Sequence, residues 1–309
     1  MLKYFITTII RFLCGQNIKK KLIRFCYIER TRECCPGVRI PKNIEITSNL
    51  KQCIDKAKIV VLAVPTNAVR EVARELSLYL QEDQVICLVS KGIEKSSNKL
   101  LSEVVFEETS SENICMLSGP SFAIELAKGS EAGLVVASKS QVANMAVKVC
   151  LENENIVVKT LNDIIGVQVC AAAKNVFAIL VGMVDSINKN ESFRASILTC
   201  VLNDLRIIVE VLGGKAHTIF SYAGVGDLLL TCMSLKSRNY TLGHYIGKGM
   251  DLDQALNEMK LSTVEGLYTL DSLLKLLEEK QIKIKSLEFL YNSLYRNERI
   301  ENILRYIKY

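Results

Sequence analysis

The 309-residue sequence lacks several features that mark common functional classes. It has no tryptophan and only 6% aromatic residues, so side chains on which nucleic-acid bases could stack are scarce. It contains two histidines, His217 and His244, and no Cys-x-x-Cys pair, so we expect no metal site. No uninterrupted run of eighteen apolar residues occurs, which predicts that no segment is stably inserted in a membrane.

The cysteines and the first residues indicate a cytoplasmic protein. Eleven cysteines are scattered without a disulfide framework, which is typical of reduced intracellular thiols. Residues 1–14 are partly apolar, but Thr7, Thr8 and Arg11 interrupt them and no small-residue cleavage site follows, so they do not form a signal peptide. The net charge of +6 fits an anionic small substrate and a nucleotide cofactor, and by itself it also fits a nucleic-acid binder.

The glycine loop of dinucleotide-binding domains is also missing. Such domains open with a strand, then Gly-x-Gly-x-x-Gly, then a helix whose N-terminal amides hold the pyrophosphate. None of the sixteen glycines has this spacing. The Gly-x-Gly pairs at 224–226 and 247–249 carry leucine at the third glycine position.

The first half of the chain nevertheless alternates strand-like and helix-like segments. Short continuous apolar runs are typical of buried parallel strands, and the segments between them have helical periodicity. This alternation predicts a Rossmann-like parallel α/β sheet. The predicted strands are residues 58–64, 85–89, 114–117 and 133–137, and the predicted helices are residues 67–80 and 97–106.

The second half of the chain has a different pattern. Over residues 164–212 and 252–308 the apolar residues recur at intervals of three and four, without a strand-like run. We therefore predict two domains, a Rossmann-like domain over residues 1–162 and an all-helical domain over residues 163–309.

Two lysines stand out as candidate site residues. Lys174 lies between small and apolar residues, and burial would lower its pKa toward neutrality, which suits proton exchange. Lys91 directly follows a predicted strand, and the carboxyl ends of parallel strands face the ligand crevice. A solvated loop lysine is the alternative for Lys91.

Four motifs, in order, resemble those of the bacterial NAD(P)-dependent glycerol-3-phosphate dehydrogenases. They are Ser-Gly-Pro-Ser-Phe-Ala at 118–123, Ala-Ala-Ala-Lys-Asn-Val-Phe-Ala at 171–178, Gly-Val-Gly-Asp at 224–227 and Ser-Arg-Asn at 237–239. The resemblance is good from about residue 46 to the C-terminus. It implies reversible hydride transfer between NAD or NADP and dihydroxyacetone phosphate, giving sn-glycerol 3-phosphate for glycerophospholipid synthesis. A homodimer is a further expectation.

The resemblance also implies roles for individual residues. It makes Lys174 the proton acceptor for the substrate hydroxyl. The implied substrate-binding residues are Lys91, Gly119, Ser121, Lys174, Asp227, Ser237, Arg238 and Asn239. The implied cofactor-binding residues are Lys91, Ala123, Arg238, Thr263 and Glu265.

The missing glycine loop leaves alternatives open. We expect that the family's first strand and glycine loop are lacking through a late start codon, a frameshift or gene decay; a divergent replacement by residues 1–15 is the other explanation. The corresponding alternative for function is a catalytically dead remnant that at most binds a sugar phosphate. A nucleic-acid binder rests on the charge alone.

Overall fold

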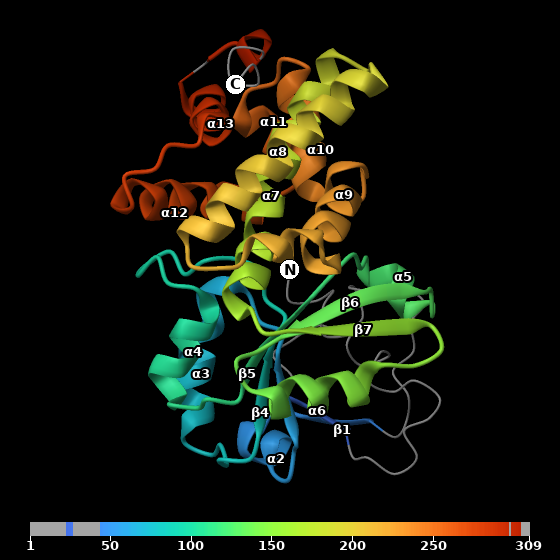
Figure 1. Cartoon of the computed structure of the whole chain (residues 1–309), viewed down its shortest axis with the longest axis vertical. Helices are drawn as coiled ribbons and strands as arrows, with labels where there is room; N and C mark the ends of the chain where they lie inside the picture. Colours follow the sequence, from blue (N-terminus) through green and yellow to red (C-terminus); the bar gives the residue numbers. More distant parts are fainter. Residues whose placement is uncertain (1–22, 27–43, 297, 304–309) are drawn as a thin grey trace. The chain divides into compact units, whose positions relative to one another are not determined.

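The computed structural model describes residues 23–26, 44–296 and 298–303 (Figure 1). The chain divides into two compact units: Met1–Ser90 with Leu101–Ile164, and Lys91–Leu100 with Ile165–Tyr309. The short segment Lys91–Leu100 therefore belongs to the second unit, where Ile93 and Leu100 join the helical core.

The first unit is built on parallel strands. One pair joins β1 (Ile23–Cys26) to β2 (Ile44–Thr47). A second sheet contains, in spatial order, β3 (Ile59–Leu62), β4 (Val85–Leu88), β5 (Ile114–Ser118), β6 (Ala132–Ala137) and β7 (Ile156–Leu161). Four of the five pairings in the two sheets are parallel, which confirms the Rossmann-like fold class.

The predicted parallel sheet contains one antiparallel pairing, because β6 runs antiparallel to β5. The connection between them holds only the five-residue helix α5 (Ala123–Ala127), too short to cover the sheet as crossover helices do. Gly119 starts this turn with φ +148°, and a Cβ there would lie 2.7 Å from the carbonyl oxygen of Gly133 on β6. Glycine thus allows β6 to return close beside β5.

The individual elements largely follow the sequence pattern. All four predicted strands are present, whereas β1, β2 and β7 were not predicted. The helix predicted over residues 67–80 is α3 (Val69–Ser77), preceded by the 3₁₀ turn Thr66–Ala68. The helix predicted to begin at residue 97 is α4 and begins at Leu101 (Leu101–Thr109), because Asn98 adopts φ +55° and Ile93 pairs with Leu100.

Helices cover the sheet of the first unit. Helix α6 (Gln141–Leu151) lies along β4, β5, β6 and β7, and α3 packs beside α4 (Figure 1). The side chain of Ser140 caps α6 by accepting a hydrogen bond from the amide of Ala143. All four residues of β4 are buried, so both faces of this strand are covered.

The second unit is helical, as predicted. Its longest elements are α7 (Ile164–Ile187), α8 (Glu191–Val211) and α12 (Glu265–Glu279). Shorter elements are η2 (Ala216–Phe220), the π-helical turn η3 (Tyr222–Gly226), α9 (Asp227–Cys232), α10 (Arg238–Gly247), α11 (Leu252–Glu258), α13 (Lys285–Tyr295) and η4 (Ile300–Asn302). A short α2 (Leu50–Ile54) belongs to the first unit.

Helix α7 is the central element of the helical core. Most of its apolar residues, such as Phe177, are buried, and burying one such side chain contributes about 1.5–3 kcal/mol. Among the described residues, α7 is the one helix long and apolar enough to cross a membrane. Since 94% of its apolar window is buried inside the protein, its apolar character is explained by the core.

Glycines set the closest helix contact in this unit. A Cβ on Gly182 of α7 would lie 2.1 Å from the carbonyl oxygen of Tyr240, and one on Gly243 of α10 would lie 1.9 Å from that of Ile179. Neither space can hold a methyl group, so the backbones of α7 and α10 are in direct contact. This contact sets how closely α10 approaches α7, which carries Lys174.

Candidate active site

Lys174 lies in the middle of α7 and is buried. Small side chains, Ala171–Ala173, precede it, and Val176 and Phe177 follow it; all of them are buried in the core. The helix is continuous here, and the neighbours of Lys174 on both sides along the chain are buried. The lysine side chain is 8% exposed, so its ammonium group needs a partner inside the protein.

That partner is Asp227, the first residue of α9. The turn before it is tight: a Cβ on Gly224 would lie 2.1 Å from the carbonyl oxygen of Ile219, which explains the glycine of the Gly-x-Gly-Asp motif. The ammonium of Lys174 donates a hydrogen bond to Oδ1 of Asp227, and the ammonium of Lys91 donates one to Oδ2 at 2.9 Å. One buried carboxylate is therefore shared by two lysines.

This sharing determines how the three groups titrate. Burial lowers the pKa of Lys174, the attraction of Asp227 opposes this, and the charge of Lys91 lowers it further, to about 8. Burial also disfavours the charge of Lys91, but the charge and hydrogen bond of Asp227, with smaller contributions from Lys174 and Glu265, together raise the pKa of Lys91. Burial alone would raise the pKa of Asp227, whereas the two ammonium groups hold it below its ordinary value. Lys174 is therefore the member of the trio whose proton is released near neutral pH.

A second carboxyl group lies near the lysines. Glu265 begins α12, and the side-chain amide of Asn175 donates to its Oε2 at 3.2 Å. Burial raises the pKa of Glu265, although the charges of Arg238, Lys91 and Lys174 counteract this. The next residue is Gly266, where a Cβ would lie 2.7 Å from the carbonyl oxygen of Asn175. The start of α12 is thus pressed against α7 beside Lys174.

The N-terminus of α10 supplies donors for an anion. Ser237 is the N-cap, and its side chain accepts from the amide of Tyr240 at 3.3 Å. Asn239 accepts from the amide of Gly266 at 3.0 Å through Oδ1. Arg238 is exposed and makes no ion pair with a described residue. A free guanidinium at a helix N-terminus is well suited to bind phosphate.

The structure brings together most of the residues singled out in the sequence. Those in the second unit gather on α7, α9, α10, the start of α12 and the segment before α4: Lys91, Lys174, Asp227, Ser237, Arg238, Asn239 and Glu265. Thr263 lies two residues before Glu265, and its hydroxyl donates to the carbonyl of Val264 at 3.4 Å. Among these residues, Ser237 is the one whose hydroxyl caps helix α10.

The other three predicted residues lie in the first unit. Gly119 and Ser121 follow β5, and the hydroxyl of Ser121 donates to the carbonyl of Gly119 at 3.1 Å. Ala123 is the first residue of α5. Their predicted roles in substrate and cofactor binding remain predictions.

Two site contacts were not found from the sequence. Lys91 binds the same carboxylate as Lys174, although it is 136 residues from Asp227 along the chain. Asn175 orients Glu265 across 90 residues. The only local signal was the Lys174–Asn175 pair within an apolar helix. In the described part of the chain, no cluster of three His, Cys, Asp or Glu could hold a metal ion.

Two family models match the chain. The model described as "NAD-dependent glycerol-3-phosphate dehydrogenase N-terminus" matches residues 22–144, and the corresponding C-terminus model matches residues 163–305. The chain is 35% identical over 263 residues to glycerol-3-phosphate dehydrogenase [NAD(P)+] of Clostridium tetani, covering 85% of this chain and 75% of that protein. It is 36% identical over 284 residues to the protein of that name from Wolbachia pipientis wMel, covering 89% and 86%.

Solved structures give the same similarity. The crystal structure of a glycerol-3-phosphate dehydrogenase from Coxiella burnetii superposes with a TM-score of 0.82 at 27% identity, over 89% of this chain and 84% of that one. The enzyme of that name from Saccharomyces cerevisiae superposes with a TM-score of 0.87 at 19% identity, over 99% and 96%, which concerns the fold alone.

Proposed function

The chain belongs to the family of NAD(P)-dependent glycerol-3-phosphate dehydrogenases, and we propose that it interconverts dihydroxyacetone phosphate and sn-glycerol 3-phosphate. The observation that supports this most directly is the buried trio in which Asp227 binds both Lys91 and Lys174. A ketone reduction needs a group that can give or take one proton near neutral pH. Lys174, with a pKa lowered to about 8, meets this requirement.

Lys174 is the proposed general acid and base. In the reduction direction its ammonium donates a proton to the oxygen on C2 of dihydroxyacetone phosphate; in the oxidation direction the neutral amine accepts the proton of the C2 hydroxyl. Asp227 holds the amine in place. Lys91 stays charged beside it, since its pKa is raised, and can stabilise negative charge that develops on the substrate oxygen.

The substrate phosphate is proposed to bind at the N-terminus of α10. Arg238 supplies a planar guanidinium, and the first amides of the helix have no intrahelical partner. Asn239 and Ser237 flank them. Gly119 and Ser121 of the first unit and Lys91 of the second unit are further proposed substrate contacts. Holding the phosphate orients C2 toward the reacting groups.

The residues of the second unit also fit a dinucleotide. Arg238 is an exposed cation beside helix amides, as a phosphate requires, and Glu265 is held by Asn175 next to the lysines. We propose that Lys91, Ala123, Arg238, Thr263 and Glu265 contact NAD or NADP. When bound, the nicotinamide supplies or takes the hydride.

Further proposals concern the domain bounds, the cellular location and the partners of the protein. We propose domains over residues 1–162 and 163–309, action in the cytoplasm as a homodimer, no stable membrane insertion, and no nucleic-acid partner. The product would supply glycerophospholipid synthesis.

Turnover by the purified chain tests the proposal. NADH and NADPH oxidation is followed with dihydroxyacetone phosphate, at cofactor concentrations up to about 1 mM. Lys174→Met keeps the apolar stem of the side chain and removes the ammonium, so we expect it to lower kcat by about 10²–10⁴-fold. A parent protein that binds the substrate phosphate without any turnover would favour the alternative of a catalytically dead remnant. Equal turnover by parent and variant would contradict the role of Lys174.

A further inference from the structure

A second buried charge network lies in the helical unit, away from the lysine trio. Asp185 is on α7, three turns after Lys174, and its side chain is 2% exposed. Its Oδ1 accepts from Nε of Arg194 at 2.8 Å, and its Oδ2 accepts from the hydroxyl of Tyr240 at 2.8 Å. None of these residues belongs to the proposed proton-transfer or phosphate-binding set.

The network acts on the helix that carries the proposed phosphate site. Tyr240 directly follows Asn239 in the first turn of α10, and it is buried. Burial and the Asp185 carboxylate raise the pKa of Tyr240 to about 12, so it keeps its proton and remains a donor. The phenol therefore ties the first turn of α10 to α7.

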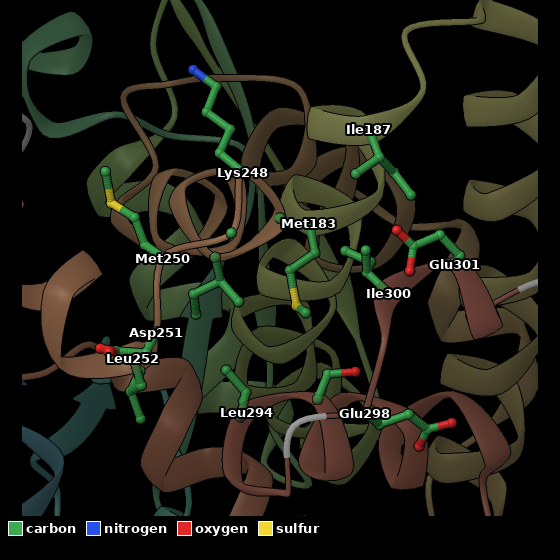
Figure 2. A pocket seen from close by; sticks show the side chains of 14 residues that line it. Met183, Ile187, Lys248, Met250, Asp251, Leu252, Leu294, Glu298, Ile300 and Glu301 are labelled. Atoms are coloured by element: carbon green, nitrogen blue, oxygen red, sulfur yellow. The ribbon is translucent and has the colours of Figure 1, made fainter.

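Backbone contacts at glycines also hold α10 against α7. The glycine contacts of Gly182 and Gly243 set how closely α10 approaches α7, but a glycine surface has no side chain that fixes sliding or rotation. The close contact continues to Gly247 of α10, where a Cβ would lie 2.4 Å from the carbonyl oxygen of Met183. Met183 and Ile187 of α7 and Ile246 of α10 line a pocket of about 430 Å³ (Figure 2). At the start of α10, two directional hydrogen bonds add to these contacts. Tyr240 donates to Asp185 of α7, and Asn239 accepts from the amide of Gly266 on α12.

We propose that Asp185 and Tyr240 are positioning residues, which set the place of Arg238 and Asn239 for the substrate phosphate. This rests on the proposed function. The buried carboxylate is suited to the task because it accepts from two elements at once, α8 through Arg194 and α10 through Tyr240. Hydrogen bonds to a charged group are stronger and more directional than neutral ones.

The test compares Tyr240→Phe with a matched control. Ser286→Ala also removes one hydroxyl that donates to a carboxylate, that of Asp204, elsewhere in the same unit. In the full chain we expect Tyr240→Phe to raise KM for dihydroxyacetone phosphate about three- to tenfold, with kcat within about twofold of the parent. Ser286→Ala should lower the melting temperature by a similar amount and leave KM unchanged.

Asp185 variants provide the second measurement. Asp185→Asn retains an oxygen that can accept from Tyr240, whereas Asp185→Ala retains none. We expect the asparagine variant to keep a KM closer to that of the parent than the alanine variant does. If Tyr240→Phe folds poorly, these two variants replace it as the test. A higher KM in Asp185→Ala than in Asp185→Asn supports the positioning role, and equal KM values contradict it.

The outcomes are distinguishable. A parent protein without turnover would refute the proposed function. An active parent whose KM is the same in Tyr240→Phe, Asp185→Ala and Ser286→Ala, with comparable losses of melting temperature, would show that the network only stabilises the fold. A KM increase confined to the Asp185 and Tyr240 variants supports the positioning role.

Discussion

Lys174 and Lys91 bind the two oxygens of one carboxylate, so the protonation of each depends on the other. The pKa of Lys174, about 8, predicts opposite pH dependences for the two directions of the reaction. In glycerol 3-phosphate oxidation the amine must start neutral, so kcat/KM should rise as pH passes about 8; in the reduction direction it should fall. The substrate phosphate titrates near pH 6, outside this window. Initial rates between pH 7 and 10 measure both profiles, and parallel profiles would contradict the assignment.

Removing the charge of Lys91 should shift the inflection in the oxidation profile, which is the pH near 8 at which kcat/KM for glycerol 3-phosphate rises. Its positive charge lowers the pKa of Lys174, and it competes for Asp227. Lys91→Met removes both this repulsion and this competition, so the inflection in the oxidation profile should move to higher pH. Lys95→Met is the control, because Lys95 lies on the same segment but over the ring of Tyr268. An inflection at the same pH in Lys91→Met would show that the two lysines are not coupled.

Arg238 should contribute mainly to substrate binding. A lysine at this position keeps the charge but lacks the paired donors that grip phosphate. Arg238→Lys should raise KM for dihydroxyacetone phosphate by about tenfold, with little loss of thermal stability, since Arg238 is exposed. Arg206→Lys, which changes a half-buried arginine on α8 that pairs with Glu210, serves as the control. Unchanged KM together with lower stability in Arg238→Lys would indicate a structural role.

At the scale of elements, the contact between α7 and α10 determines where the proposed phosphate site lies relative to Lys174. In an open helix, glycine to alanine stabilises by about 1 kcal/mol. At Gly243 the added methyl would meet the carbonyl oxygen of Ile179 at 1.9 Å, so we expect Gly243→Ala to lower the free energy of unfolding by about 1–3 kcal/mol. Chemical denaturation measures the difference, and a gain in stability would show that the helices can move apart freely.

The elements themselves were largely predictable, and the exceptions have physical causes. Continuous apolar runs marked β3 to β6 because buried strands need apolar side chains on both faces. The direction of β6 was not predictable, since it depends on how the chain turns at Gly119. The strand β7 was missed because only part of it is buried, and its exposed positions include Lys159 and Thr160.

At the scale of the whole molecule, the absence of a Gly-x-Gly-x-x-Gly spacing in the 309 residues bears on cofactor affinity. The family's sheet and helical domain are present, but the loop that normally holds the pyrophosphate has no counterpart in the sequence. We therefore predict that the 309-residue chain binds NADH and NADPH with Kd above about 0.1 mM. Fluorescence titration of the purified protein measures this. A Kd in the low micromolar range would show that other residues hold the pyrophosphate.

The sequence alone determined the fold class, the helical second half and the candidate lysine. These depend on local periodicity and on ordered motifs, which are properties of neighbouring residues. Only the tertiary structure decided which side chains share a partner: it placed Lys91 and Lys174 on one carboxylate, Asn175 on Glu265, and Tyr240 on Asp185. The pKa of Lys174 likewise depends on burial and on charges far away in the chain. Such quantities depend on distances in space, which no pattern of neighbouring residues contains.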